Sequence, residues 1–438
     1  MTLTKKHIRP FAKLHGYWIY KRFLVETESW SLEQKRDYVF DRLKQTLVRA
    51  GEGVPFYRER FRTIGFEPQS DFRDLGDLGR LPVLTKQDIR ENFDQMIDRR
   101  FYRGSVLAST SGSTGEPTQM RLNEWYIALD YACMFRHWAK AGYSFRSRSG
   151  ALRTYTPKSD EGPFWRFSRS QNTLYLSPYH LRPSNIDEYV SIIVRYKPQF
   201  LRGYPSALTV LAEHVYDRRD ELSFVCGVFP TSETLMDKER TNIERTFGDV
   251  VYDWYGMTEP AVVITENRSH DGMSVEWVYG YPELLPSDMG GCQHELLATS
   301  LHNPVMPFIR YETGDVLEVR GGAPEADELY PRITSICGRK DDCILTPDGG
   351  RLPSLNFYSL FQEYSEVLRF QFVQESVERV VVKVQFRPNG DNGQQLKDLK
   401  MEIRARLGSS ITINLEETSD FVQTGEGKIP PFIFLRKS

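Results

Sequence analysis

The sequence predicts an α/β protein with a large N-terminal domain of layered α/β sheets, residues 1–340, and a small mobile α+β domain, residues 341–438. Three observations support this. At 438 residues the chain is too long for one ordinary hydrophobic core. From about residue 150 to residue 255, short apolar segments alternate with segments of helical periodicity, which indicates parallel strands covered by helices. After about residue 343 the pattern changes to paired strands followed by one helix.

The first eighty residues are expected to be mainly helical. Residues 31–50 carry apolar side chains near the 3.6-residue spacing of a helix, and residues 54–57 break the pattern. Thr85 is expected to cap the next helix, with Asp88 at its third position. A longer helix is predicted over residues 123–141.

In the middle of the chain, predicted strands alternate with predicted helices. Strands are predicted at residues 150–155, 173–176, 200–202, 224–230 and 250–255. Helices are predicted near residues 184–196, 205–217 and 234–247. The last part is expected to contain antiparallel strands at 367–375 and 378–387, a helix near 394–407 and a final strand at 411–416.

Composition excludes several classes of protein. The apolar share of 40% and charged share of 26% are ordinary for a globular protein, and a net charge of -2 gives no electrostatic reason to expect nucleic acid. No run of 18 apolar residues indicates a transmembrane helix, and the first residues lack the features of a secretory signal. The five scattered cysteines suit reduced thiols, so a cytoplasmic location is expected.

The N-terminal segment is unusual. Residues 1–25 contain six Lys or Arg and no acid, with aromatic residues interleaved. Such a helix can rest on an anionic membrane surface, or it can pack its aromatic side chains on the domain behind it. The packed helix is the preferred interpretation, because exposed amphipathic helices are rarer.

Residues 109–118 form the most informative segment. They follow an apolar run, residues 105–108, that is expected to be a strand, and they hold six hydroxyls and two glycines. A segment with so little apolar area cannot build a core, but its backbone N–H groups and hydroxyls can surround an anion. A loop that binds nucleotide phosphates is predicted, with a flexible linker as the alternative. The expected phosphate contacts are Ser109, Thr110, Ser111, Gly112, Ser113, Thr114 and Gly115.

Two further segments suit a nucleotide. Residues 255–259 follow the predicted strand 250–254, and a loop at the carboxyl end of a parallel strand is where such sheets bind ligands. Tyr255 offers a face for a base, and Glu259 offers a carboxylate for Mg²⁺. In residues 310–315, Asp315 beside a glycine can accept both hydroxyls of a ribose, although a capped turn is an equal alternative.

Two last segments lie at the predicted domain boundary and near the end of the chain. Residues 338–342 lie where the composition changes, and a solvated charged linker is the alternative to a functional hinge. Residues 424–430 place Lys428 in a glycine-rich loop, for which the alternative is a flexible tail. Neither a Walker loop nor a Rossmann glycine pattern is present.

In this order the five segments resemble the adenylate-forming superfamily. They are most similar to its phenylacetate–CoA ligase and CapK branch, which includes capsular polysaccharide biosynthesis proteins and coenzyme F390 synthetase. Segments typical of that branch are residues 54–58, 81–86, 202–206 and 303–311. The resemblance covers residues 50 to 434 and implies a large N-terminal domain with a mobile C-terminal domain.

The resemblance also implies roles for single residues. The loop at 109–118 would cover the β- and γ-phosphates, and its Glu116 replaces a lysine of many relatives. Other implied nucleotide contacts are Ser232 and Glu233 at adenosine, Tyr255 and Gly256 at adenine, Thr258 at the α-phosphate, Asp315 and Arg339 at the ribose. Implied catalytic and hinge residues are Glu259 holding Mg²⁺, Lys428 bridging the carboxylate and the α-phosphate, and Asp341 as the hinge.

The implied activity is ATP-dependent activation of a carboxylic acid as an acyl-adenylate, followed by transfer to coenzyme A. Two alternatives stay open: transfer to an amine or hydroxyl acceptor in polysaccharide or cofactor biosynthesis, and a non-catalytic nucleotide-binding protein of a polysaccharide assembly. The presence of Glu259, Asp315 and Lys428 argues against the last. The acid pocket is expected from residues 130–180 and 200–260, and a homodimer is left open.

Overall fold

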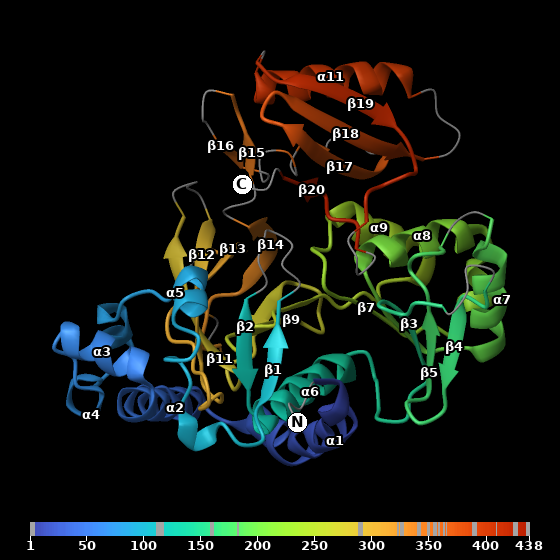
Figure 1. Ribbon diagram of the computed structural model, residues 1–438. Helices are drawn as coiled ribbons and strands as arrows, with labels where there is room; N and C mark the ends of the chain where they lie inside the picture. Colours follow the sequence, from blue (N-terminus) through green and yellow to red (C-terminus); the bar gives the residue numbers. More distant parts are fainter. Residues whose placement is uncertain are drawn as a thin grey trace. The chain divides into compact units, whose positions relative to one another are not determined.

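The computed structural model confirms the α/β class (Figure 1). The chain forms two compact units: unit 1 is Met1–Phe145 with Trp254–Ile336, and unit 2 is Arg146–Asp253 with Cys337–Ser438. Residues 5–434 are described apart from 111–117, 158–161, 182–183, 288–291, 322–323, 325–327, 340–342, 348–350, 354–356, 358–359, 362–363, 365, 388–391, 409 and 424–427. The proposed boundary at residue 340 stays a prediction.

Unit 1 begins with helices, as expected. They are α1 (Lys5–Ile19), α2 (Leu32–Gly53), α3 (Pro55–Thr63), α4 (Pro68–Asp71), α5 (Lys86–Glu91) and α6 (Glu124–Ala139). The predicted cap of α5 is confirmed, since the Asp88 backbone donates to the Thr85 hydroxyl at 3.1 Å and the Thr85 backbone donates to the Asp88 carboxylate at 2.9 Å. No helix among those described is long and apolar enough to cross a membrane.

A seven-stranded sheet, which the sequence analysis did not predict, forms the rest of unit 1. Its order is β11-β12-β13-β14-β10-β9-β8. The strands are β8 (Trp254–Gly256), β9 (Val263–Glu266), β10 (Met273–Val275), β11 (Gly280–Pro286), β12 (Gln293–Ser300), β13 (Tyr311–Val319) and β14 (Ile333–Arg339). A separate hairpin joins β1 (Val106–Ser109) to β2 (Gln119–Leu122), which confirms the strand predicted before the hydroxyl-rich loop.

The strand predicted at 250–255 is wrong in its extent and its pairing. Val251 makes only an isolated parallel bridge to Val228, whereas β8 begins at Trp254 and pairs antiparallel with β9. Tyr255 therefore lies within an antiparallel strand and not in a loop after a parallel one. The apolar run indicated extended chain, but the partner of each half depends on residues far away in the sequence.

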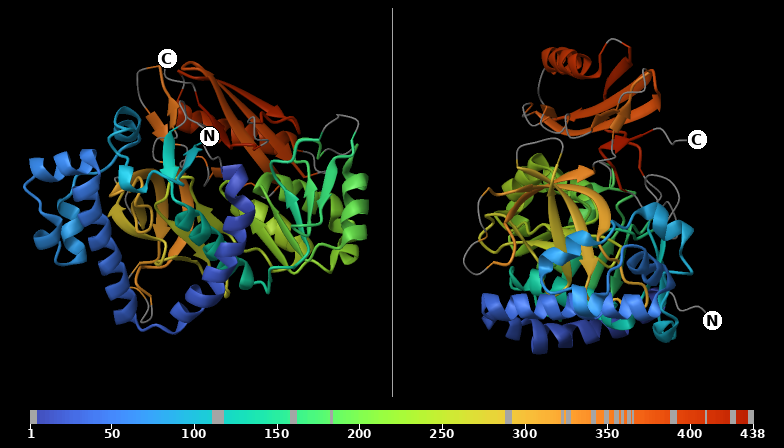
Figure 2. Two further views of the ribbon diagram at one scale, coloured as in Figure 1. Left: turned by 60° about the horizontal axis from the view of Figure 1, so that its bottom comes forward. Right: turned by 90° about the vertical axis from the view of Figure 1, so that its left-hand side faces the viewer.

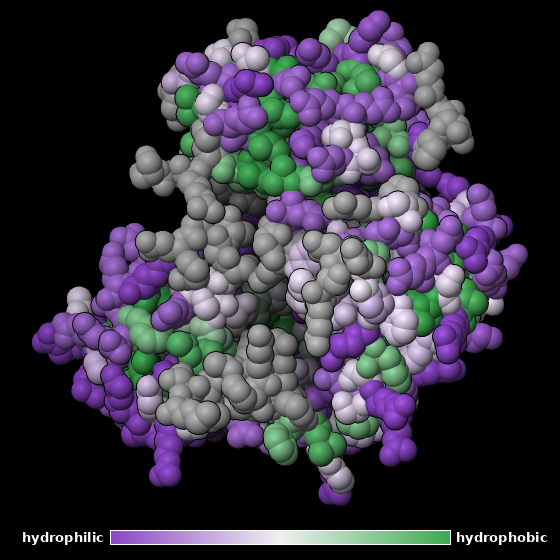
Figure 3. Space-filling view, turned by 45° about the vertical axis from the view of Figure 1, so that its right-hand side comes forward, coloured by the Kyte–Doolittle hydropathy of each residue, from purple (hydrophilic) through white to green (hydrophobic). Residues whose placement is uncertain are grey.

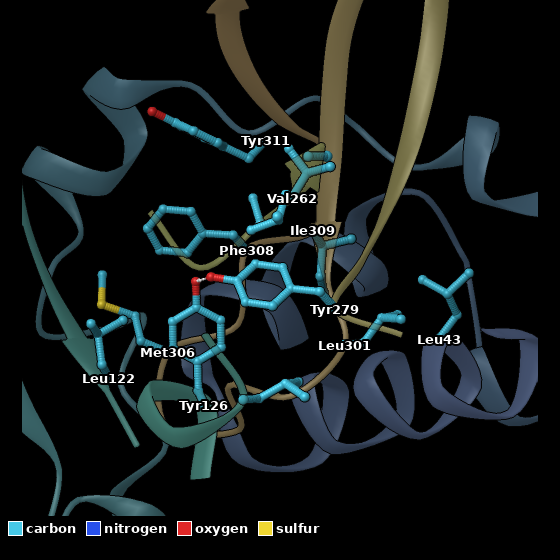
Figure 4. Close-up of a cluster of buried hydrophobic side chains, with 14 of the residues drawn as sticks. Leu43, Leu122, Tyr126, Val262, Tyr279, Leu301, Met306, Phe308, Ile309 and Tyr311 are labelled. Carbon is cyan, nitrogen blue, oxygen red and sulfur yellow. Dashed lines mark hydrogen bonds between the residues drawn. The ribbon is translucent and has the colours of Figure 1, made fainter. Parts of the chain in front are cut away.

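Residues 303–311 hold several elements of unit 1 together. The Asn303 side chain accepts from the Asn123 backbone at 3.0 Å and donates to the carbonyls of Arg121 and Met306 at 2.9 and 2.8 Å. The buried Tyr57 hydroxyl of α3 donates to the Pro307 carbonyl at 2.9 Å. In Figure 4, Phe308 and Tyr311 lie in a cluster with Tyr126 and Tyr279, whose hydroxyls are hydrogen-bonded.

The first part of unit 2 has the predicted parallel sheet. Its order is β4-β5-β3-β6-β7, and β5, β3, β6 and β7 run parallel while β4 is an antiparallel edge strand that was not predicted. The strands are β3 (Ser149–Leu152), β4 (Trp165–Ser168), β5 (Thr173–Leu176), β6 (Phe200–Gly203) and β7 (Gly227–Pro230). The helices are α7 (Ile186–Tyr196), α8 (Pro205–Val215) and α9 (Asp237–Phe247).

The second part of unit 2 confirms the α+β prediction. Strand order is β19-β18-β17-β20, with β17 (Val367–Ser376) and β18 (Arg379–Phe386) antiparallel, and β15 (Cys343–Leu345) pairs with β16 (Arg351–Pro353). Helix α11 (Gly393–Leu407), β19 (Thr412–Glu417) and β20 (Phe432–Ile433) complete it. These elements share a hydrophobic core of their own.

Hydrophilic residues predominate on the face of the molecule seen in Figure 3.

A glycine allows α1 to pack closely on α6. A Cβ placed on Gly16 would lie 2.5 Å from the Tyr131 Cβ and 2.6 Å from the Ala128 carbonyl oxygen, distances that force a neighbour to move. Small residues are therefore needed at this contact, which seats the N-terminal helix on the rest of unit 1 (Figure 1).

We expect Gly16→Ala to lower the free energy of unfolding by about 1–3 kcal/mol, the usual cost of overpacking. In an unconstrained helix the same change is stabilising by roughly 1 kcal/mol, so the sign is informative. Urea denaturation measures the effect, and Gly79→Ala is the matched control, because a Cβ there meets nothing within 4 Å. A Gly16→Ala variant as stable as the wild type would contradict the close contact.

Candidate functional site

The ends of the hydroxyl-rich loop are held together. Ser109 ends β1 opposite Gln119 of β2. The Thr110 backbone donates to the Thr118 carbonyl at 3.0 Å, and the Thr118 backbone donates to the Thr110 hydroxyl at 3.0 Å. Residues 111–117 lie outside the described residues, so the phosphate contacts of Ser111 to Gly115 stay predictions.

Tyr255 and Asp315 meet, although they are 60 positions apart in the sequence. The Tyr255 hydroxyl of β8 donates to the Asp315 carboxylate of β13 at 2.6 Å. Burial raises the pKa of Tyr255 well above its usual value, and the negative charge of Asp315 raises it further, so the phenol stays a neutral donor. Gly314, with φ at 77°, turns the chain immediately before Asp315. Tyr255 and Asp315, predicted for adenine and for ribose, thus lie together in unit 1.

Glu259 is a buried carboxylate held by a neutral donor. Its side chain is among the buried polar groups, at 7% exposed, and accepts a hydrogen bond from the Tyr311 hydroxyl at 2.9 Å. Burying a carboxylate is costly unless a cation or several donors balance its charge. Mg²⁺ is commonly held by one or two carboxylates together with phosphate oxygens. The residues present fit that ion, and no group of three metal-ligating side chains occurs among those described.

Gly256 and Thr258 precede Glu259 on the same segment. A Cβ on Gly256 would lie 2.6 Å from the Trp254 indole nitrogen, so the glycine makes room for that ring within β8. Thr258 is half-buried. The predicted contacts of both residues with the nucleotide remain untested.

Glu233 in unit 2 binds two separate parts of the chain. Its carboxylate accepts from the Ser206 backbone at 3.1 Å, from the Ser206 hydroxyl at 3.2 Å and from the Ile429 backbone at 3.0 Å. Burial raises its pKa although these donors favour the charged form. Glu233 therefore ties the start of α8 to the segment that carries Lys428. Ser232, beside it, is exposed with φ at 72°, a strained conformation for a residue with a side chain.

Lys428 lies on a segment that is fixed on its C-terminal side. Its Nζ is 6.0 Å from the centre of the buried Tyr204 ring. The Gln371 side chain donates to the Pro430 carbonyl at 2.9 Å, and the Phe372 backbone donates to the Pro431 carbonyl at 2.8 Å. The lysine is thus presented from an anchored strand end and not from a free tail. Arg339 ends β14, and the predicted hinge Asp341 lies outside the described residues.

Within residues 130–180, part of the range expected to line an acid pocket, the buried aromatic residues Trp138 and Phe164 serve packing. The Phe164 ring stacks on the rings of His180 and Tyr189 within the core of unit 2, with ring centres 4.6 and 6.3 Å apart. Trp138 packs on Phe135 and Tyr143 inside unit 1. These rings do not define the shape of an acid, so its identity does not follow from them.

Sequence reasoning missed the phenol that orients Glu259. Tyr311 belongs to the segment 303–311 quoted for the resemblance, but it received no role there. The available signal was its position within residues 310–315, the segment that carries Asp315. Arg369, whose guanidinium donates to the Ser206 carbonyl at 2.5 Å, was also missed, because nothing local marks it.

Comparison with known proteins identifies similar sequences over most of the chain. Residues 344–433 match the CapK C-terminal domain. Protein CapK of Staphylococcus aureus is 27% identical over 81% of this chain and 79% of its own length. Phenylacetate-coenzyme A ligase of Pseudomonas putida is 25% identical over 93% of this chain and 96% of its own length. This chain is a homologue of both. The resemblance stated from the motifs is thereby confirmed.

The fold of this CapK and phenylacetate-coenzyme A ligase homologue is also that of a solved ligase. The structure of 2-hydroxyisobutyryl-CoA ligase in the postadenylation state matches it with a TM-score of 0.70, at 20% identity, over 93% of this chain and 91% of that one. The expected fold is therefore confirmed, since the two chains share it over nearly their full lengths.

A group of buried acids lies near Glu233 in the same unit of this homologue. Burial raises the pKa of Glu239 to about 7 and that of Glu213 to about 7, while the positive charge of Arg369 opposes both shifts. The Glu239 carboxylate also accepts from the Met236 backbone at 3.2 Å and so caps α9. These carboxyls make the folding of unit 2 sensitive to pH.

We expect Glu239→Gln to stabilise the protein at pH 8 and to have little effect at pH 5. A carboxyl whose pKa is raised in the folded state binds more protons when folded, so stability falls as the pH rises from about 4.5 to about 7. The shift corresponds to at most about 3 kcal/mol, and the glutamine oxygen retains the cap. Denaturation by urea at several pH values measures the effect, with Glu244→Gln on the same helix as control. A variant less stable than the wild type at pH 8 would show that the ionised carboxylate is favourable.

Proposed function

We propose that this protein activates a carboxylic acid with ATP, forming an acyl-adenylate and releasing pyrophosphate, and then transfers the acyl group to the thiol of coenzyme A. The observation that carries the proposal is the 2.6 Å hydrogen bond between Tyr255 and Asp315. It joins an aromatic ring suited to adenine with a carboxylate suited to ribose hydroxyls. The homology to phenylacetate-coenzyme A ligase supports the same reaction.

The residues suit the first step chemically. An oxygen of the substrate carboxylate attacks the α-phosphorus of ATP, the bond to the β-phosphate breaks, and pyrophosphate leaves. Because two anions must approach each other, positive charge is needed where the new bond forms. Mg²⁺ bound at Glu259 would neutralise part of the phosphate charge. Lys428 would lie between the carboxylate and the α-phosphate, and the loop at 109–118 would bind the leaving pyrophosphate.

In the second step the acyl group passes from AMP to the thiol of coenzyme A. The thiolate of coenzyme A attacks the acyl carbon, a thioester forms, and AMP leaves. A C-terminal domain, residues 341–438, that turns about Asp341 would withdraw Lys428 and admit the acceptor. Cys133, Cys226 and Cys292 are free thiols, as is usual in a reducing compartment, and we place the reaction in the cytoplasm.

The CapK match favours a second candidate for the acceptor. Residues 344–433 carry the CapK C-terminal domain, the part of the chain that would approach the acceptor. An amine or a hydroxyl of a polysaccharide or cofactor precursor would then take the place of the thiol, with the adenylation step unchanged.

Acid-dependent exchange of pyrophosphate into ATP tests the first step. A panel of aryl, fatty, amino and uronic acids should contain at least one that supports exchange. Product analysis with and without coenzyme A then separates the two acceptors, since a thioester forms only in the first case. ATP binding without exchange for every acid would favour a non-catalytic nucleotide-binding protein.

We expect Lys428→Ala to lower the exchange rate by about 10²–10³-fold, the usual effect of removing one group that stabilises developing charge. ATP affinity should change much less, because the charge matters most in the transition state. Lys400→Ala, at an exposed lysine of α11, is the control. Near-normal exchange in Lys428→Ala would exclude the catalytic role.

A second variant tests how Glu259 is oriented. Tyr311→Phe removes the hydroxyl at 2.9 Å from the Glu259 carboxylate without removing the ring. We expect the Mg²⁺ concentration needed for half-maximal exchange to rise about tenfold, since a lost hydrogen bond to a charged group is worth about 1.5–3 kcal/mol. Tyr189→Phe, which removes a buried hydroxyl that donates to the Ser177 carbonyl in the core of unit 2, is the control. An equal Mg²⁺ dependence in wild type and Tyr311→Phe would exclude Glu259 as the metal ligand that Tyr311 positions.

A further inference from the structure

The N-terminal helix exposes a stripe of large apolar side chains. Phe11 is 73% exposed, Leu14 is 49% exposed and Trp18 is 54% exposed. They are three and four positions apart, so they lie along one face of the helix. The left-hand view of Figure 2 looks onto the side of the molecule where α1 lies. Isolated exposed apolar residues are ordinary, but a continuous stripe on one helix indicates an interaction surface.

The opposite face of the same helix is seated on unit 1. Ala12 and Ile19 are buried, and Gly16 touches Ala128 and Tyr131 of α6. The Tyr17 ring lies 5.4 Å from the Phe135 ring. The packed interpretation favoured from the sequence therefore describes one face only. The stripe points away from α6, and helix α1 is held in place without it.

The charges beside the stripe have one sign. The first 25 residues contain six Lys or Arg and no acid. Lys21 and Arg22, both exposed, follow Trp18 in the short π-helix Tyr20–Leu24, and the Arg22 guanidinium lies 5.3 Å from the centre of the Trp18 ring. The nearest acids along the chain, Glu26 and Glu28, begin only after the stripe ends. Apolar side chains bordered by cations complement an anionic lipid surface.

We propose that residues 11–25 hold this protein on the surface of an anionic lipid bilayer. Helix α1 lies in the plane of the interface, with Phe11, Leu14 and Trp18 inserted between the headgroups and acyl chains. Lys21 and Arg22 contact the anionic headgroups. None of the described helices is long and apolar enough to cross a bilayer, so the contact is peripheral. This role is independent of the ligase reaction and adds a location to it.

Co-sedimentation of the full chain with lipid vesicles tests the proposal. One vesicle preparation is phosphatidylcholine alone, and the other is phosphatidylcholine mixed with phosphatidylglycerol. We expect binding to the anionic vesicles, much weaker binding to the neutral ones, and a decrease as salt is added. Binding to neither preparation, or equally to both, would overturn the proposal.

Two variants locate the contact. Phe11→Ser combined with Leu14→Ser and Trp18→Ser should lower vesicle affinity at least about tenfold, because inserted side chains of this size each contribute substantially to partitioning. Lys21→Ser combined with Arg22→Ser should remove much of the salt dependence. Met401→Ser, at a residue of α11 that is 63% exposed, should bind like the wild type. The same vesicle binding in the stripe variant as in the wild type would overturn the proposal.

A second copy of the chain is the competing occupant of the stripe. Sedimentation velocity distinguishes it without lipid. A wild-type dimer that becomes monomeric in the stripe variant, with vesicle binding unchanged, would assign the face to self-association and exclude the membrane contact. Because the three side chains are exposed, their replacement should leave thermal unfolding unchanged, which separates lost binding from lost folding.

Discussion

Unit 1 depends on the short segment at residues 303–311, which has almost no regular structure of its own. The Asn303 amide fixes it to the end of β2, the Tyr57 hydroxyl fixes it to α3, and the Arg310 guanidinium pairs with Glu283 of β11 at 2.9 Å. Buried backbone groups in such a segment are costly without partners, and these side chains supply them. Because β13 begins directly after it, the segment determines where Tyr311 and Asp315 lie. The hairpin that carries the hydroxyl-rich loop is bound to the same support.

Glu233 in unit 2 and Glu259 in unit 1 are stabilised in different ways. Glu233 accepts three protein hydrogen bonds, which offset part of the cost of its burial. Glu259 accepts a hydrogen bond from the neutral Tyr311 hydroxyl, which offsets little of the cost of burying a charge. A cation at Glu259 would offset more of that cost. Glu233 thus joins two parts of unit 2, whereas Glu259 fits a metal ion.

Sequence patterns predicted the elements whose causes are local. The cap of α5, the parallel strands of unit 2 and the order of the motifs all follow from neighbouring residues or from periodicity. The antiparallel sheet of unit 1 was missed because its strands are short and each pairing joins residues distant in the sequence. The same reason explains the misplaced strand at 250–255. The hydrogen bond between Tyr255 and Asp315 joins β8 and β13, which are not neighbours in the sheet, so nothing local in the sequence expresses it.

The distribution of apolar side chains on α1 is opposite to that of an ordinary packed helix. A helix that only covers a domain places its large apolar residues inward and its polar residues outward. Here the inward positions include Ala12 and Gly16, which bury little area, whereas Phe11, Leu14 and Trp18 face outward. Burying large apolar side chains stabilises a fold more than burying small ones. In this helix the large side chains are exposed, so they contribute little to the free energy of folding. Close contact through small residues holds α1 on α6, and the large side chains remain available for another apolar phase. The adjoining cations favour a lipid bilayer with an anionic surface.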